Sequence, residues 1–142
     1  MQVQELMSKD PVLVETREPV SSAAQLMRAR NIGVMPVCDG RGRLVGMLTD
    51  RDITIRCVAA KLDPAATPVE AIMSRGAVTA EPSEDVQQAL EKMHAEQIRR
   101  LPVVRDGKLV GMLSLADVAR SHSMDMEAAR ALSGITSNIC RK

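Results

Sequence analysis

An internal repeat constrains this chain of 142 residues more than any other feature. The dipeptide Pro36-Val37 returns as Pro102-Val103, and Gly-Met-Leu-Thr at 46–49 returns as Gly-Met-Leu-Ser at 111–114. The spacing between the two copies is constant except for one residue, which is lost in the turn between these segments. Self-similarity at a fixed spacing is typical of a duplicated structural unit. We therefore predict two similar units in a chain that is long enough to bury a hydrophobic core.

Each predicted unit contains an amphipathic helix followed by a strand hairpin. Apolar residues recur at the spacing of one helix face in both copies: Val20, Ala23, Ala24 and Met27, then Val86, Ala89, Leu90 and Met93. Short strands flank the turn that begins with Asp39-Gly40, and their counterparts flank Asp106-Gly107. An Asp-Gly pair predicts a tight hairpin turn with positive φ at both residues. A second helix is expected to follow Asp52, and another to follow Asp117.

The repeat also gives the predicted domain boundaries. The first unit spans residues 1–60 and the second spans residues 69–120, with a linker at 61–68. Residues 121–142 form a tail, in which apolar residues recur at four-residue spacing: Met124, Ala128 and Leu132. This spacing predicts a helix. That helix either docks on the core of its own unit or contributes to a dimer contact.

Charge and aromatic content argue against several classes of partner. The net charge is +1, from 19 basic and 18 acidic residues, so nothing attracts nucleic acid or an anionic membrane. The chain has no Phe, Tyr or Trp, on which single-stranded nucleic acid usually stacks. No apolar run has the length of a membrane span, and the N-terminus lacks the apolar core of a signal peptide. We therefore predict a cytoplasmic protein without nucleic-acid or membrane partners.

The Cys and His residues predict neither a metal site nor catalysis. Cys38, Cys57 and Cys140 form no C-x-x-C pair and are distant in sequence from both histidines. Cys38 and Cys57 suit small buried apolar positions instead. His94 and His122 have no nucleophile at a recognisable spacing, and no G-x-S-x-G or H-E-x-x-H motif occurs. We therefore predict no bound metal and no enzymatic activity.

The recurring turn, Thr49-x-x-Asp52 and Ser114-x-x-Asp117, has two compatible interpretations. A Ser or Thr before a helix and an acidic residue three positions later form a capping box. The same turn offers free backbone N–H groups and the positive end of a helix dipole, which suit a phosphate. Its carboxylate could accept hydrogen bonds from both hydroxyls of a ribose. The turn is therefore a cap alone, or a cap that also binds a ribose phosphate.

Together these features resemble a tandem pair of cystathionine-β-synthase (CBS) domains, also called a Bateman module. In the first copy the matching features are Met7-Ser8-x-x-Pro11, the helix from Val20 to Met27, Ile32-x-x-Met35-Pro36-Val37 and Gly46-x-x-Thr49-x-x-Asp52. In the second copy they are Met73-Ser74, the helix from Val86 to Met93, Ile98-Arg99-Arg100-Leu101-Pro102-Val103 and Gly111-x-x-Ser114-x-x-Asp117. The resemblance covers residues 3–120 and is greatest for small stand-alone bacterial and archaeal proteins with two CBS domains.

The resemblance implies an α/β (α+β) fold of two CBS units. Each unit would have a small three-stranded sheet with helices, and the units would pack about a pseudo-two-fold axis. Two clefts between the units would bind adenosine-containing ligands. AMP, ADP or ATP would be the ligand, with S-adenosylmethionine or NAD as alternatives.

The resemblance also implies a set of nucleotide-binding residues. One cleft would contain Ser8, Val12, Ile32, Gly33, Val34, Met112, Ser114 and Asp117. The other would contain Ser74, Val78, Ile98, Arg99, Arg100, Met47, Thr49 and Asp52. The aliphatic members would hold the adenine, and Asp52 or Asp117 would hold the ribose. Arg99 and Arg100 replace Gly33 and Val34 of the first copy; they would either reach ligand phosphates or remain a solvated pair.

The predicted function is that of a regulatory module, a sensor of energy state or metabolites that an unknown protein partner reads. A homodimer formed through the CBS helices is the assembly that the resemblance implies. The alternative is a ligand-free interaction or dimerisation module whose clefts are vestigial.

Overall fold

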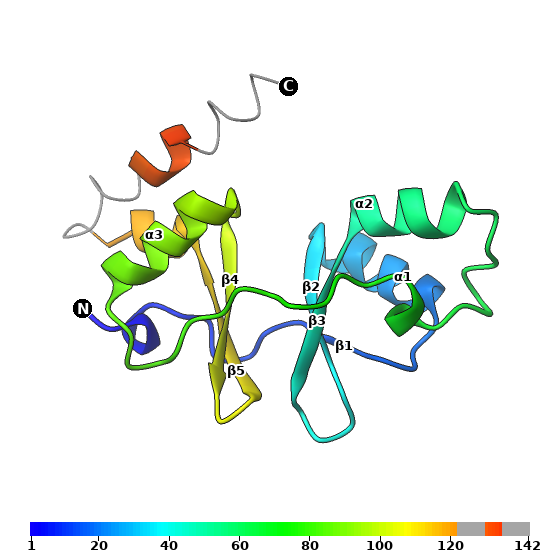
Figure 1. The fold of residues 1–142 in the computed structure, drawn as a ribbon, viewed down its shortest axis with the longest axis horizontal. Helices are drawn as coiled ribbons and strands as arrows, with labels where there is room; N and C mark the ends of the chain where they lie inside the picture. Colours follow the sequence, from blue (N-terminus) through cyan, green and yellow to red (C-terminus); the bar gives the residue numbers. More distant parts are fainter. Residues whose placement is uncertain (122–129, 135–142) are drawn as a thin grey trace. The chain divides into compact units, whose positions relative to one another are not determined.

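The computed structural model describes residues 1–121 and 130–134, shown as a ribbon in Figure 1. The chain forms two compact units. One unit is Val12–Ala77, and the other combines Met1–Pro11 with the residues from Val78 onwards. The N-terminal segment therefore packs within the unit that is formed mainly by the second repeat. The domain boundaries that follow the sequence repeat remain a prediction.

The unit Val12–Ala77 is built on a three-stranded sheet with the order β1-β2-β3. Its strands are β1 (Val14–Glu15), β2 (Val34–Cys38) and β3 (Leu44–Thr49). β1 lies parallel to β2, and β2 lies antiparallel to β3. The predicted three-stranded sheet is therefore present in this unit.

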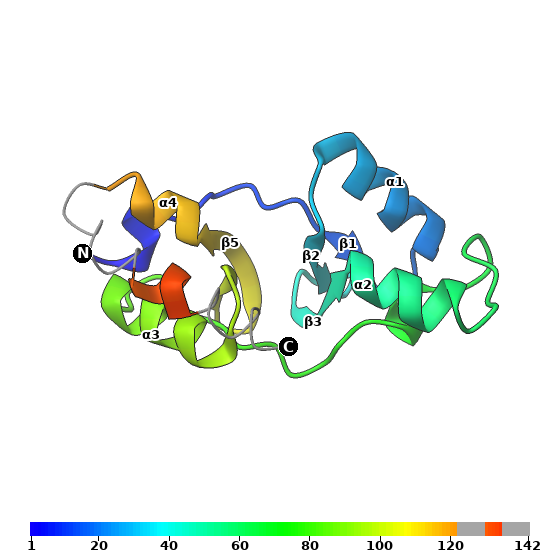
Figure 2. The same ribbon diagram turned by 90° about the horizontal axis from the view of Figure 1, so that it is seen from above.

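The helices of this unit lie on one side of its sheet, as Figures 1 and 2 show. They are α1 (Val20–Arg30) and α2 (Asp50–Asp52), and α2 continues as the π-helix η2 (Ile53–Val58). The predicted apolar face of α1 is confirmed, because three of its four members are buried: Val20, Ala23 and Met27. The core around them contains Val14, Met35, Val37, Leu48, Cys57, Val69, Ile72 and Met73. The 3-10 helix η3 (Val69–Ala71) contributes Val69 to this core.

The other unit repeats this plan with the strands β4 (Arg100–Arg105) and β5 (Lys108–Ser114). Its helices are α3 (Val86–Glu96), α4 (Leu115–Ala119) and the 3-10 helix η1 (Val3–Glu5). All four predicted apolar positions of α3 are buried, together with Val3 of η1. Along the described part of the chain, every helix is too short or too polar to cross a membrane.

The prediction of a three-stranded sheet is wrong for this second unit, whose sheet has two strands. The counterpart of β1 is reduced to a single parallel bridge between Ala80 and Val103. In the first unit the ladder continues, since the Thr16 amide donates to the Cys38 carbonyl at 3.1 Å. Pro82 occupies the position of Thr16 in the second copy. Proline has no N–H to donate, so the strand ends there.

The two hairpin turns differ by the residue that the repeat loses. Asp106 and Gly107 both adopt positive φ, at 52° and 81°, as the Asp-Gly pair predicts. In the longer first turn only Gly42 has positive φ, at 81°, so the same prediction is wrong for Asp39-Gly40. Instead, the Asp39 carboxylate accepts hydrogen bonds from two backbone amides within the turn, those of residues 41 and 43.

The C-terminal segment that the structure describes is a short helix of residues 130–134, which lies beside α3 in both views (Figures 1 and 2). Ala131 is buried and belongs to the core of this unit, whereas Leu132 is exposed. The apolar contact is therefore made one position earlier than the four-residue spacing predicts. Met124, Ala128, His122 and Cys140 lie outside the described residues.

Candidate functional site

The first copy of the recurring turn is a complete capping box at the start of α2. The Asp52 amide donates to Thr49 Oγ1 at 3.0 Å, and the Thr49 amide donates to Asp52 Oδ2 at 2.9 Å. Asp52 is only 9% exposed, so the carboxylate is largely shielded from water. The capping interpretation is confirmed for this turn.

The second copy forms the same capping box at the start of α4. The Asp117 amide donates to Ser114 Oγ, and the Ser114 amide donates to Asp117 Oδ2, both at 3.0 Å. Ser114 and Asp117 are each half-buried. The duplicated sequence therefore produces the same hydrogen-bond geometry twice.

Each capping box leaves a donor and an acceptor unused by the cap itself. The hydroxyl oxygen accepts the cap bond, so its hydrogen is available to donate. The second carboxylate oxygen faces an arginine: Arg56 Nε lies 3.9 Å from Asp52 Oδ1, and the Arg120 guanidinium pairs with Asp117 Oδ1. A hydroxyl donor beside a carboxylate acceptor matches the hydrogen-bonding groups of a ribose diol.

The backbone N–H groups of the first turn, in contrast, already have acceptors. The Asp50 amide donates to the Gly33 carbonyl at 2.9 Å, and the Arg51 amide donates to Asp50 Oδ1 at 2.8 Å. The other two amides of residues 49–52 belong to the capping box. The expectation of free N–H groups for a phosphate is therefore wrong at this turn, and side chains must supply the donors.

A Met-Ser segment crosses β3 just before the first turn. Ser74 and Met47 exchange two backbone hydrogen bonds, each of 2.9 Å. A Cβ atom at Gly46 would lie 2.6 Å from the Ser74 carbonyl oxygen and 2.9 Å from Met73 Sδ. Gly46 is therefore required by the close approach of this segment.

The same crossing occurs over β5 in the other unit. Ser8 and Met112 exchange two backbone hydrogen bonds, of 2.8 and 3.0 Å. A Cβ atom at Gly111 would lie 2.7 Å from the Ser8 carbonyl oxygen. The close approach of the crossing segment therefore explains the glycine in both copies of the motif.

The structure brings together part of each predicted residue set. One unit holds Ser8, Met112, Ser114 and Asp117, and the other holds Ser74, Met47, Thr49 and Asp52. The other members of each predicted set belong to the opposite unit: Val12, Ile32, Gly33 and Val34 for the first set, and Val78, Ile98, Arg99 and Arg100 for the second. The two complete sets therefore remain a prediction.

Arg100 is the first residue of β4, and Arg99 directly precedes it. Arg100 pairs with Ser114 across the sheet, as Val34 pairs with Thr49 in the first copy. Both arginines are exposed, and neither has an ion-pair partner within residues 1–121 and 130–134. Their guanidinium groups are therefore available to an anion.

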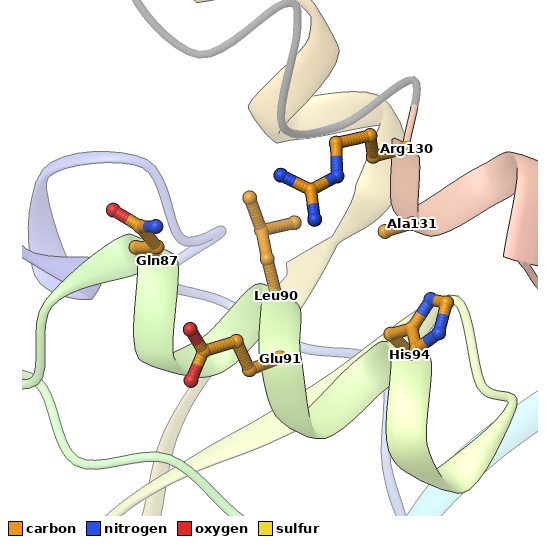
Figure 3. Close-up of a pocket in the computed structure, with 6 residues that line it drawn as sticks. All are labelled: Gln87, Leu90, Glu91, His94, Arg130 and Ala131. Carbon is orange, nitrogen blue, oxygen red and sulfur yellow. The ribbon is translucent and has the colours of Figure 1, made fainter.

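A separate pocket of about 230 Å³ lies between α3 and residues 130–134 (Figure 3). Its lining residues are Gln87, Leu90, Glu91, His94, Arg130 and Ala131. Figure 3 shows Leu90 and Arg130 extending between the two helices, with the exposed His94 at one end. None of the predicted nucleotide-binding residues lines this pocket, so the candidate site remains at the two turns.

Arg56 and Arg120, the partners of the two turn carboxylates, were not predicted from the sequence. Arg56 follows Asp52 by four residues, and Arg120 follows Asp117 by three. Ion pairs at both spacings are common on one face of a helix. That spacing was the signal that could have identified them.

Comparison with protein families matches the CBS domain model to residues 3–58 and 69–123. Among curated proteins, the chain is similar to the CBS domain-containing protein YhcV of Bacillus subtilis, with 37% identity over 94% of each chain. It is also 37% identical to hypoxic response protein 1 of Mycobacterium tuberculosis, over 82% of this chain and 81% of the relative.

Solved structures give the same result. The crystal structure of hypoxic response protein I contains two coordinated zinc ions and has a TM-score of 0.78, with 36% identity, covering 84% of this chain and 98% of that one. The CBS domain protein PAE2072 from Pyrobaculum aerophilum, complexed with AMP, has a TM-score of 0.77 and 28% identity, covering 92% and 99%. The CBS domain pair of protein MJ0100, in complex with 5'-methylthioadenosine and S-adenosyl-L-methionine, has a TM-score of 0.72 and 30% identity, covering 84% and 94%.

Within residues 1–121 and 130–134, no three His, Cys, Asp or Glu side chains gather as a metal-binding group. Cys38 and Cys57 are free and buried, as predicted for small apolar positions.

Proposed function

Because this chain belongs to the CBS domain family, we propose that it binds an adenosine-containing ligand at the turns Thr49–Asp52 and Ser114–Asp117. The observation that carries the proposal is the hydrogen-bonding capacity that each capping box leaves beyond the cap, in its hydroxyl hydrogen and in a carboxylate oxygen that also faces an arginine. Each box presents a hydroxyl donor next to a carboxylate acceptor. We assign the ribose to these groups, with Asp52 and Asp117 as acceptors of its hydroxyl protons.

Adenosine is the part that the ligands of two similar structures share. AMP is bound to PAE2072, and 5'-methylthioadenosine and S-adenosyl-L-methionine are bound to the MJ0100 pair. The exposed Arg99 and Arg100 favour a phosphorylated ligand for this chain, because a guanidinium group binds phosphate through two parallel hydrogen bonds. AMP, ADP or ATP is therefore our preferred ligand class.

The adenine would be held by aliphatic and sulfur-containing side chains, since the chain has no aromatic residue. Met47 and Met112 are half-buried and lie two residues before the hydroxyl of each turn. The flexible, polarisable thioether of Met adapts to a planar ring. The aliphatic residues Val12, Ile32, Val78 and Ile98 complete the proposed adenine contacts.

The proposed role is regulatory, with a change of shape or rigidity upon ligand binding that a protein partner reads. Ligand binding would also stabilise the folded protein by about 2.7 kcal/mol at a hundredfold excess over Kd. The proposal includes no catalytic step.

Calorimetric titration with AMP tests the ribose assignment. Asp52→Asn and Asp117→Asn keep an acceptor for the cap but remove the negative charge, so each is expected to weaken AMP binding about tenfold, as for one hydrogen bond to a charged group. Asp106→Asn is the matched control, because it removes a carboxylate from a hairpin turn with positive φ that Asn also tolerates. AMP affinity that is unchanged in both turn variants would refute the assignment.

A protein-interaction module is the second candidate, and exposed apolar side chains on one helix favour it. Ile55 is 51% exposed and Val58 is 61% exposed on η2. They lie three residues apart near the end of this helix. We propose that a homodimer would use these two side chains. Light scattering that shows a dimer for the native chain and a monomer for Val58→Asp would support this role, whereas a monomeric native chain would exclude it.

A further inference from the structure

The Arg56 side chain contacts three groups: the Asp52 carboxylate and the carbonyls of Ile72 and Met73. Its guanidinium Nη1 donates to the carbonyl oxygens of Ile72 at 3.3 Å and Met73 at 3.2 Å. Its Nε atom lies 3.9 Å from Asp52 Oδ1. One cation therefore contacts both the carboxylate of the first turn and two carbonyls of the segment that crosses β3.

The two carbonyls belong to a structurally constrained place. They immediately precede Ser74, whose amide and carbonyl are both bonded to Met47. The chain then runs on through Ala77 into the other unit. Arg56 thus lies where a change at Asp52 can alter how firmly the crossing segment is held.

The helix that carries Arg56 is unusual. It is the π-helix Ile53–Val58, which follows directly from α2. Single turns of π-helix are rare and frequently occur at functional sites. This conformation, like the contacts of Arg56, is specific to the first copy of the repeat among the described residues.

Among the described residues, no arginine connects the second turn to its crossing segment in this way. Arg120 pairs with Asp117, but it makes no hydrogen bond to the carbonyls of Leu6 or Met7 among the described residues. Those carbonyls are the counterparts of Ile72 and Met73 in the repeat. The two turns therefore have the same capping geometry but a different connection to their crossing segments.

We propose that Arg56 is a positioning residue that transmits ligand occupancy at the Thr49–Asp52 turn to the crossing segment at residues 72–74. The inference rests on the proposed function, because it assigns the ribose to Asp52. Ribose hydroxyls on Oδ1 would replace the long ion pair to Nε. The guanidinium would then interact only with the carbonyls of Ile72 and Met73, and its hydrogen bonds to them would strengthen. The Thr49–Asp52 turn is accordingly the regulatory one of the two.

Residue-resolved amide hydrogen exchange of the ligand-free protein tests whether Arg56 stabilises the crossing segment. In Arg56→Gln we expect the Ser74 and Met47 amides to exchange about fivefold faster, a modest change because the Arg56 side chain is 52% exposed. Arg56→Lys keeps the charge and is expected to be intermediate. Arg120→Gln is the matched control and should leave the Ser8 and Met112 amides unchanged. Equal exchange in native protein and Arg56→Gln would overturn the proposal.

The same measurement with saturating AMP tests the transmission. We expect AMP to slow exchange of the Ser74 and Met47 amides in the native protein and to leave them unchanged in Arg56→Gln, although AMP still binds to that variant. Identical slowing in both proteins would overturn the proposal, since a merely structural arginine would give that result. Failure of AMP to bind the native protein would instead contradict the proposed function, and Arg56 would then be a structural clamp only.

Discussion

Replacing Gly46 by alanine tests whether the crossing of the Met-Ser segment explains the glycine of the recurring motif. The added Cβ would lie 2.6 Å from the Ser74 carbonyl oxygen, whereas ordinary contacts begin at 3.4 Å. The segment must therefore move away by about 0.8 Å. A shift of that size stretches the two 2.9 Å bonds between Met47 and Ser74 beyond hydrogen-bonding distance.

The expected loss follows from these two bonds. Each bond contributes about 1 kcal/mol net to the free energy of unfolding. Alanine offsets about 0.5 kcal/mol of the loss, because it restricts the unfolded chain more than glycine does. We therefore expect Gly46→Ala to lower the free energy of unfolding by about 1.5 kcal/mol.

Urea unfolding followed by far-ultraviolet circular dichroism measures this difference. Gly40→Ala is the matched control, since a Cβ at Gly40 meets nothing within 4 Å and its φ is not positive. We expect that control to be within about 0.5 kcal/mol of the native protein. If Gly46→Ala is as stable as Gly40→Ala, the explanation of the motif glycine is refuted.

Three further predictions follow from single groups. Arg100→Ala is expected to weaken AMP binding more than adenosine binding in calorimetric titrations, and equal losses would exclude a phosphate contact. Burial, and after it the charges of Asp39 and Glu15, raise the pKa of the Cys38 thiol to about 11. Iodoacetamide at pH 8 should therefore alkylate Cys38 in urea but not in the native protein, and mass spectrometry detects the difference. Backbone hydrogen bonds from residues 43 and 41 lower the pKa of Asp39 below its usual 3.8. The Asp39 carboxyl therefore stabilises the fold above that value and ceases to do so as pH falls through its lowered pKa, and Asp39→Asn should remove this part of the acid dependence of the urea midpoint.

The repeat predicted the elements because local patterns determine them. The apolar faces of α1 and α3 follow from side-chain spacing, and the capping boxes follow from Thr49 and Ser114 with their acidic partners. The duplicated strands also pair alike, with an irregularity between Val37 and Cys38 in one sheet and at the equivalent place in the other.

Local patterns could not show which distant segments meet at the turns. The family resemblance placed Ser8 and Met112 in one set, but their backbone pairing depends on the packing of Met1–Pro11 with the second repeat, which is a long-range contact. The reach of Arg56 to Ile72 and Met73 depends on the same kind of contact. One local signal was overlooked: Pro82, which ends the strand at Ala80, was readable from the sequence.

Titration of methyl-labelled protein with AMP, followed by nuclear magnetic resonance, tests the central claim most directly. The chain contains no Phe, Tyr or Trp, so an adenine ring bound against Met47 or Met112 would be the dominant source of ring-current shifts at those methyl groups. We predict large upfield shifts of these methyl resonances as AMP saturates the protein. Saturation without such shifts, or no binding at millimolar AMP, would contradict adenosine recognition at the two turns.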